Sequence, residues 1–504
     1  MMHLPILSLL IWLPILGAVA ILCLCKEDKA TLARLIALGV ALISLVLCIP
    51  LWCEFNTSQY AMQFVEMHTW IPALSIHYNL GVDGISMPLV VLSTFTTLIV
   101  VLAAGTTVKQ KVSQYMAAFL VLQGMMVGVF AALDAMLFYV FWEGMLIPMY
   151  LCIGIWGSNN RNYASVKFFL YTFIGSILML VAFLYLGMHA HSFDIRHLYQ
   201  VHIPYTAQVL VFFAFLLGFA VKVPMWPVHT WLPDAHTEAP AGGSVILAAL
   251  MLKMGAYGFL RFSMPIVPDA CQHWYPLMIA LSLIAIVYIG FVAIVQKDMK
   301  RLIAYSSVAH MGFATLGCFM LYLIVARTSN HAAAMLGIEG SMVQMISHAF
   351  STGALFVGIG IIYEQMHTRL IKDYGGIVNT MPIFASFLVL FAMANVGLPG
   401  TSGFVGEFMV LLSSFQASPW ITFAAASTLI LSAAYTLWMV KRVVWGDIAN
   451  PQVAKLKDIG CADVIVMSLL AVGVIGLGVY PNVLLNVFHS SVGHLMQLAL
   501  AHKV

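Results

Sequence analysis

The chain has 504 residues, of which 62% are hydrophobic and only 8% are charged, whereas soluble domains have about 45–50% and about 25%. So few charged side chains cannot form the solvated surface of a globule of this size, which excludes an ordinary soluble protein, a disordered chain and a secreted disulfide scaffold. The 22 basic residues nearly balance the 19 acidic ones and are scattered singly or in pairs, so nothing indicates nucleic-acid binding. What remains is a helical membrane protein with many spans.

Apolar runs follow one another along the chain, and each is about 20 residues long, the length that crosses a bilayer as a helix. We therefore expect an all-α integral membrane protein with fourteen spans. The runs begin near residues 5, 31, 79, 115, 135, 165, 208, 242, 276, 303, 338, 381, 419 and 463. Because no Lys or Arg precedes Lys26 and no clear cleavage site follows, the first run is interpreted as a span and not as a signal peptide.

Basic residues gather in alternate loops, and in membrane proteins the excess of Lys and Arg marks the cytoplasmic loops. If the N-terminus lies outside, 16 basic residues fall in inside loops and 4 fall outside. The inside set is Lys26, Lys29, Arg34, Lys109, Lys111, Arg161, Lys167, Lys297, Lys300, Arg301, Arg369, Lys372, Lys441, Arg442, Lys455 and Lys457. The outside set is Arg196, Arg261, Arg327 and Lys503. This division predicts that both termini lie on the outer side.

Two of the expected spans contain helix-breaking residues. The run from about residue 208 continues past Lys222 into VPMWP (223–227), and the run from about 381 reaches NVGLPGTSG (395–403) before a further dozen or so apolar residues. An additional full span needs about 20 residues, so each run is expected to be one span made of two half-helices, the seventh and the twelfth. Paired interruptions five spans apart predict inverted repeats, as in secondary transporters.

The same spacing divides the chain into four parts. Residues 1–110 would hold the first three spans, 111–265 a five-helix repeat of spans 4–8, and 266–445 a second repeat of spans 9–13. Residues 446–504 would form a loop and the last span. Sequence identity between the two repeats is faint, so this division rests on the pattern of interruptions.

Six ionisable side chains fall inside the expected spans, where a charge costs several kcal/mol and is a functional candidate by default. Glu143 stands about eight residues into span five, about 12 Å deep at about 1.5 Å per residue. The others are Lys222 at the end of the first half of span seven, Lys253 midway along span eight, His310 and His348 in spans ten and eleven, and Glu407 in the second half of span twelve.

We interpret the order acid, base, base, acid as a proton relay. Burial disfavours a charged side chain and a neighbouring opposite charge favours it, so contact between Glu143 and Lys222 would hold the lysine protonated and separation would release its proton. Lys253 would carry the proton onward, and Glu407 would be its last carrier. The structural alternatives are a static Glu143–Lys222 pair, an amine of Lys253 extended toward the interface, and a water cavity lined by Glu407.

The histidines have the same two interpretations. Histidine titrates near neutral pH, so His310 and His348 could relay a proton between Lys253 and the second broken helix, or they could be interface residues with satisfied hydrogen bonds. His229 and His236 lie beside the prolines of span seven and are interpreted as structural.

Nothing in the sequence indicates a resident cofactor or metal. The eight cysteines include no CxxC pair; the nearest two are Cys23 and Cys25, and most others lie in apolar runs. This is not the thiolate set of an iron–sulfur cluster. No dinucleotide-binding fingerprint or Walker A sequence occurs either.

Three segments resemble the signatures of one family. They are KVPMWPVHTWLPDAHTEAP (222–240), FWEGMLIPMY (141–150) and QKDMKRLIAYSSVAHMGF (296–313), and they are similar to motifs of the antiporter-like subunits of respiratory complex I. That family is related to Mrp-type cation/proton antiporter subunits and to subunits of membrane-bound hydrogenases. The resemblance covers residues from about 80 to 445.

Within the family, LKMGAYGFLR (252–261) resembles the M-type subunits, the bacterial counterparts of mitochondrial subunit four. Glu407 stands where L-type, N-type and Mrp-type relatives generally have lysine, and Thr352 stands where the L-type has lysine. The long amphipathic lateral helix of the L-type is not expected after span fourteen.

The resemblance implies a proton-pumping subunit of the membrane arm of NADH:quinone oxidoreductase in a bacterial inner membrane, with both termini on the periplasmic side. It implies that NADH, FMN, iron–sulfur clusters and quinone are held by other subunits, and that L-type and N-type chains are neighbours. The roles it implies are the ion-pair acid for Glu143, its partner for Lys222, the central relay for Lys253, the exit-side carrier for Glu407, and the polar axis between them for His310 and His348.

Three other functions stay open at this point. The chain could be an Mrp-type cation/proton antiporter subunit, which would transport Na⁺ without NADH oxidation, or the arm of a membrane-bound hydrogenase. It could also serve as a scaffold that holds neighbouring subunits together, in which case loss of Lys222 and Lys253 would harm assembly more than turnover.

Overall fold

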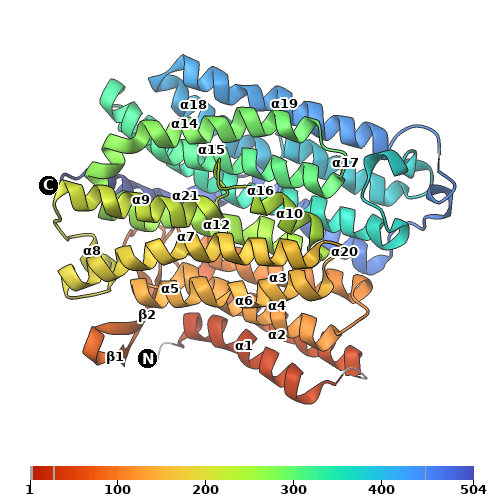
Figure 1. Cartoon of the computed structure of the whole chain (residues 1–504), viewed down its shortest axis with the longest axis horizontal. Coiled ribbons are helices and arrows are strands. Elements are labelled where there is room, and N and C mark those ends of the chain that lie inside the picture. The colour runs from red at the N-terminus through yellow and green to blue at the C-terminus, as the bar shows by residue number, and fades with distance from the viewer. Residues whose placement is uncertain (1–3, 27–28, 449, 504) are drawn as a thin grey trace.

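The computed structural model describes residues 4–26, 29–448 and 450–503. Most of its helices run along the long axis of the molecule (Figure 1). Peptide groups in lipid have no water to bond to, so a spanning segment must satisfy them internally, and a helix does so. Within the described ranges, thirteen helices are long and apolar enough to cross a membrane. The expectation of a helical membrane protein with many spans is confirmed.

The first part of the chain contains a β-hairpin that the sequence did not predict. Two helices, α1 (Ile6–Leu24) and α2 (Ala30–Cys53), precede the antiparallel strands β1 (Gln63–Ile71) and β2 (Ile76–Val82), and α3 (Met87–Thr107) follows. The expectation that a helical span begins near residue 79 was therefore wrong, because that apolar run begins as β2. A short apolar strand and a buried helical segment cannot be distinguished by periodicity alone.

Helices α4 to α13 occupy the range predicted for the first repeat. They are α4 (Val112–Ala131), α5 (Ala135–Gly144), α6 (Leu146–Trp156), α7 (Arg161–Ala190), α8 (Ile195–Leu198), α9 (Tyr205–Lys222), α10 (Trp231–Glu238), α11 (Ala241–Ile246), α12 (Leu252–Gly258) and α13 (Met264–Ile266). The eighth span runs from α11 to α13 and contains two π-helical turns, 247–251 and 259–263. Spans five and eight are thus less regular than their apolar sequences indicate.

The remaining helices form the second half of the molecule. They are α14 (Pro268–Ile294), α15 (Met299–Thr328), α16 (His331–Met366), α17 (Pro382–Val396), α18 (Ser402–Ala417), α19 (Pro419–Val443), α20 (Cys461–Val479) and α21 (Asn482–Ala499). The expectation of a single helix after residue 446 was incomplete, because α20 is the fourteenth run and α21 follows it. The described chain begins and ends toward the left-hand end of Figure 1, where the hairpin and α8 also lie.

Both predicted interruptions are present. Helix α9 ends at Lys222, before Pro224 and Pro227, which lack the backbone N–H that a continuing helix needs, and α10 follows. Helix α17 ends at Val396 and is followed by Gly397, whose φ of +85° is a left-handed conformation that glycine adopts without strain, and α18 begins at Ser402. The halves α17 and α18 are each shorter than a full span, and together they account for the twelfth.

The most deeply buried spans lie at the centre of the chain. Every residue in the most apolar stretch of the eighth span is buried, and 94% are buried in α15 and in α16, against 28% in α2 and α20. Helix α16 packs against α11, α15 and α18, so the interior joins both predicted repeats. Lys253, His310 and His348 lie on these central spans.

Candidate functional site

The first candidate pair lies where α5 meets the end of α9. Lys222 is 1% exposed, and its Nζ lies 4.8 Å from the centroid of the Trp142 ring. The charge of Lys222 acts on the Glu143 carboxylate, which Ser176 on α7 also approaches. Among the described residues, neither Lys222 Nζ nor Glu143 Oε1 has a hydrogen-bond partner. The two predicted residues are thus close neighbours without a closed ion pair, and the indole face of Trp142 is the amine's nearest stabilising contact.

Lys253 is held at a helical irregularity. Its side chain is fully buried, and Nζ donates to the carbonyl of Ala248 in the first π-helical turn of the eighth span. The same Nζ lies 2.6 Å from Nδ1 of His348 on α16. π-Helical turns of this kind are frequent at functional sites. Here the turn lies where the lysine amine reaches the second half of the molecule.

From His348 the polar side chains continue to the second broken helix. The ring centroids of His348 and His310 are 5.7 Å apart, and His310 Nδ1 lies 2.8 Å from Glu407 Oε1. Gln344, one turn before His348 on α16, donates from Nε2 to Glu407 Oε1 at 3.2 Å and lies 3.4 Å from His310 Nδ1. The structure therefore brings Lys253, His348, His310 and Glu407 into one line. Gln344 belongs to this line and was missed, because an uncharged amide is not conspicuous in a span.

Several polar atoms along the line have no protein partner among the residues that the structure describes. They are His348 Nε2, His310 Nε2, Glu407 Oε2, Gln344 Oε1, Ser347 Oγ and Thr352 Oγ1. Glu407 Oε2 faces the interruption between α17 and α18, since a Cβ at Gly397 would lie 3.2 Å from it. Buried polar groups in proteins take protein or water partners. The line is therefore suited to bridging water, which would link donors and acceptors that do not touch directly.

His236, which the sequence indicates as structural, lies close to the polar line. It is fully buried on α10 and stacks on Phe356, with ring centroids 4.6 Å apart and planes 4° apart. Neither ring nitrogen has a partner in the described part of the chain. The charges of Lys300 and Lys253 both act on it. A histidine without structural hydrogen bonds, situated between two buried lysines, is a candidate for the relay.

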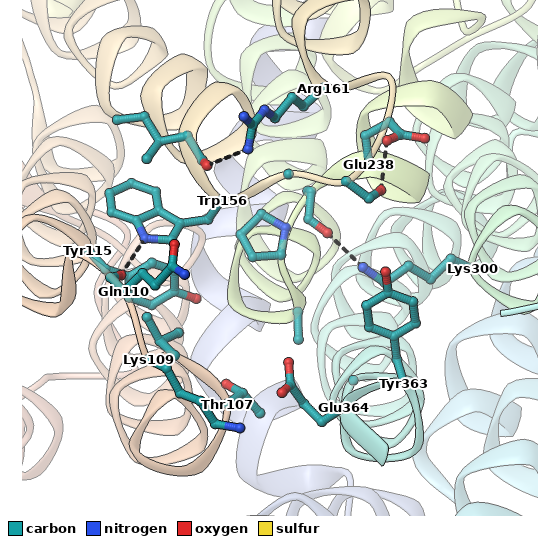
Figure 2. A pocket seen from close by; sticks show the side chains of 18 of the residues that line it. Thr107, Lys109, Gln110, Tyr115, Trp156, Arg161, Glu238, Lys300, Tyr363 and Glu364 are labelled. Carbon is teal, nitrogen blue, oxygen red and sulfur yellow. Dashed lines mark hydrogen bonds between the residues drawn. The ribbon is translucent and has the colours of Figure 1, made fainter. Parts of the chain in front are cut away.

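A polar cavity of about 380 Å³ lies at the end of α10, where Glu238 and the following residues line it together with Lys109, Arg161, Lys300 and Arg369. Figure 2 shows Lys300 reaching in from one side, while Lys109 and Glu364 lie on opposite sides of the lower part of the view. Lys300 is 3% exposed and donates from Nζ to the carbonyl of Ala239 at 2.7 Å. Glu238 also lines the cavity and accepts from Ser158 Oγ at 2.6 Å. The cavity thus brings solvent and titratable groups to the base of the first broken helix.

Ion pairs fix α10 at this end. Asp234 binds Lys167 of α7 at 2.7 Å and Arg301 of α15 at 3.5 Å. Glu238, at the other end of α10, also accepts from the backbone N–H of Asn160 at 2.9 Å. The second half of the seventh span is therefore tied to both predicted repeats and holds His236 in place.

The sequence matches two family profiles that together cover most of its length. The profile described as NADH:quinone oxidoreductase/Mrp antiporter, TM matches residues 132–432. The profile described as NADH-ubiquinone oxidoreductase chain 4, amino terminus, matches residues 8–131. The first includes all six candidate residues of the relay.

Comparison with full-length relatives indicates the type of subunit within the family. The chain is 46% identical to NADH-quinone oxidoreductase subunit M of Rhodobacter capsulatus, covering 98% of this chain and 96% of the relative. It is 43% identical to NADH-ubiquinone oxidoreductase chain 4 of Marchantia polymorpha, covering 97% of each chain. A chain of respiratory complex I from Thermus thermophilus superposes with a TM-score of 0.88 at 28% identity, covering 98% and 100%. The Mrp complex of Dietzia sp. DQ12-45-1b shares the fold, with a TM-score of 0.81 at 21% identity, covering 98% of this chain and 52% of that chain.

The fold, the buried polar line and these matches define an antiporter-like membrane subunit. The chain belongs to the family of NADH-quinone oxidoreductase subunit M, which includes NADH-ubiquinone oxidoreductase chain 4. The resemblance found in the sequence motifs is thereby confirmed.

Proposed function

We propose that this chain moves protons across the membrane as part of NADH-quinone oxidoreductase, through Lys222, Lys253, His348, His310 and Glu407. The observation that carries the proposal is the line from Lys253 Nζ, 2.6 Å from His348, to Glu407 Oε1, 2.8 Å from His310. Every group on it can bind and release a proton. If the cluster were only structural, each of four titratable groups in series at membrane depth would cost free energy without serving a function.

Glu143 and Lys222 would control the start of the relay. Because their charges interact without a closed ion pair, a small helix displacement would change the attraction between them strongly. A closer carboxylate favours the protonated lysine, and separation favours release toward Lys253. Carrying one charge across the membrane costs about 2.3 kcal/mol per 100 mV, a free energy that the redox reaction must supply.

The cavity beside Lys300 would supply the protons. Lys109 and Glu364 line it, and so does the buried Lys300, whose charge acts on His236. His236 is in turn influenced by Lys253. A proton taken up from the cytoplasm would therefore reach the central lysine through a histidine that no structural hydrogen bond restrains.

The broken helices are the elements that would transmit the redox reaction to the relay, since coupling over a distance needs an element with two arrangements. Lys222 ends the first half of one, and Glu407 faces the break of the other. Residues 111–265 and 266–445 would then act as inverted repeats. In each, the halves of the broken span pack on the preceding span, α9 and α10 on α7, α17 and α18 on α16.

The same proposal specifies which subunits hold the cofactors, which subunits flank this chain and in which membrane it lies. NADH, FMN, the iron–sulfur clusters and quinone would be held by other subunits, and L-type and N-type chains would flank this one in the membrane arm. The membrane would be a bacterial inner membrane, with both termini on its periplasmic side. The basic loop residues, gathered at the end that holds the polar cavity, support this orientation.

The test is Lys222→Ala in the whole complex, with assembly checked by native gel. NADH-driven acidification of vesicles and quinone reduction should both fall about tenfold or more, the scale on which loss of a positioned acid–base group acts. Replacing Glu143 by Gln should impair pumping in the same direction. Full activity of assembled Lys222→Ala complex would show that the lysine is structural, and reduced assembly with normal turnover would support a scaffold role.

A further inference from the structure

At the outer end of the eighth span, the polar side chains stop at a buried ion pair. Arg261, in the second π-helical turn, donates from Nη2 to Asp83 Oδ1 at 2.6 Å, and both side chains are 5% exposed. Burial raises the pKa of Asp83, in the loop before α3, but the charge and hydrogen bonds of Arg261 outweigh this effect and the pKa lies below its ordinary value. The pair is therefore fully ionised.

The pair lies on the same helix as the central lysine. Lys253, Tyr257 and Arg261 follow at intervals of four residues and so share one helix face, with about 12 Å of helix between the first and the last. On the other side, a cavity of about 370 Å³ reaches Arg261 and Asp83 from the end of the molecule that carries the hairpin. Tyr257 and Arg261 thus lie between Lys253 and this outer cavity.

The hydrogen bonds in this layer all have fixed directions. Arg261 Nε donates to the Tyr257 hydroxyl at 3.1 Å, and that hydroxyl donates to the carbonyl of Phe130 at 3.0 Å. The Tyr199 hydroxyl donates to the carbonyl of Arg261 at 3.0 Å. A guanidinium has donors only and does not lose its proton in proteins. A proton arriving from Lys253 would first meet the Tyr257 hydroxyl, which donates to a carbonyl, and the Arg261 guanidinium, which cannot release its proton, while Arg261 holds the Asp83 carboxylate in its ionised form.

We propose that Arg261, fixed by Asp83 and Tyr257, is a proton barrier that closes the outer end of the first repeat and directs protons from Lys253 to His348. The inference rests on the proposed relay through Lys253. In this proposal, Arg261 acts like the fixed positive charge in pores that must exclude protons. The opposite end of this region, at the cavity beside Lys300, is lined by groups that titrate.

The alternative is a mechanical role, in which the pair only ties the loop after β2 to the eighth span. The two roles differ in their effect on passive leak. If the pair is only a structural tie, weakening it lowers the amount of assembled complex. If the pair is a barrier, weakening it lets protons cross the membrane without turnover. The decay of an imposed pH gradient across sealed vesicles, measured without NADH, separates the two.

The main variant is Arg261→Lys, which keeps the charge and the partner but introduces an amine that can lose its proton. The second is Arg261→Gln combined with Asp83→Asn, which removes both charges so that neither is left buried and unpaired. Arg196→Lys is the matched control, because Arg196 lines the same cavity and pairs with Asp194 at 2.6 Å but is 43% exposed. All are measured in the whole complex at equal assembled amounts.

In both test variants the gradient should decay about threefold faster or more, while the control matches the unsubstituted complex. Adding Lys253→Ala to Arg261→Lys should restore the slow decay, because the leak passes through the central lysine. If the unsubstituted complex and both test variants held the pH gradient equally long, the proposal of a proton barrier would be overturned. Intact pumping in Lys253→Ala alone would instead overturn the relay, and because the leak is measured without turnover the two failures are distinguishable.

Discussion

The amine of Lys253 lies 2.6 Å from Nδ1 of His348, and this contact joins the two halves of the chain. Lys253 is on the last span of the first predicted repeat, and His348 is on α16, in the second. A lysine and a histidine in direct hydrogen-bond contact can exchange a proton without an intervening water. The whole account depends on this single transfer between the halves.

Replacing His348 with Leu should therefore stop proton transfer at the junction. Pumping driven by NADH should fall about tenfold or more in the assembled complex, because loss of a positioned acid–base group costs at least that much. Ser351→Ala is the control, since the Ser351 hydroxyl bonds only its own helix at Ser347 O. Undiminished pumping by His348→Leu would remove this histidine from the route.

Gln344 should position Glu407 without carrying protons itself. The variant Gln344→Leu removes the 3.2 Å hydrogen bond to Glu407 Oε1, and we expect pumping to slow by a few fold, about what the loss of one hydrogen bond costs. Glu407→Gln, which removes the carrier, should have the larger effect. Equal losses in the two variants would mean that Gln344 is itself essential to transfer.

A close approach of two helices places Glu407 against α16. A Cβ on Gly406 would lie 2.6 Å from the backbone nitrogen of Gln344 and 2.7 Å from its Cα, so neither helix can accommodate it without moving. Gly406→Ala should push α18 outward, destabilise the subunit by about 1–3 kcal/mol as overpacking does, and impair pumping. Gly39→Ala is the control, since a Cβ there meets nothing within 4 Å. Normal melting and pumping of Gly406→Ala complex would contradict the close packing.

Uptake through the cavity of Figure 2 can be tested at its inner wall. We expect Lys300→Met to slow NADH-driven pumping by a few fold or more, because it removes a titratable group of the cavity wall whose charge acts on His236, and a positioned acid–base group contributes at least this much. Lys109→Met, at the exposed rim of the same cavity, should leave the rate nearly unchanged. If Lys109→Met slowed pumping more than Lys300→Met, the rim of the cavity and not the buried lysine would control proton uptake.

Much of the fold could be predicted from the sequence because the bilayer imposes simple rules. Span length, the prolines after Lys222 and the glycine at 397 each act locally, and the helices end where those residues predict. The hairpin at 63–82 was not predicted, because β2 leads into an apolar stretch and resembles the start of a span in composition. The π-helical turns in span eight were missed for a related reason, since packing and not local composition creates them.

The sequence predicted the charged residues of the candidate site, but it did not predict the residues that contact them. A lysine or glutamate stands out in an apolar span, so Lys253 and Glu407 were found directly. Gln344 and His236 gain their importance from contacts with other helices, which no local pattern reveals. The Asp83–Arg261 pair joins residues 178 positions apart, so only the folded chain shows that Arg261 is buried beside a carboxylate.

The most direct test of the relay is NADH-driven proton pumping, measured together with quinone reduction, by assembled Lys253→Ala complex in sealed vesicles. Lys253 is fully buried and bonds the second half of the molecule through His348, so no neighbouring group can replace it. The account predicts that proton pumping and quinone reduction are both lost, while NADH oxidation by a soluble electron acceptor continues. Proton pumping and quinone reduction at unchanged rates would contradict it.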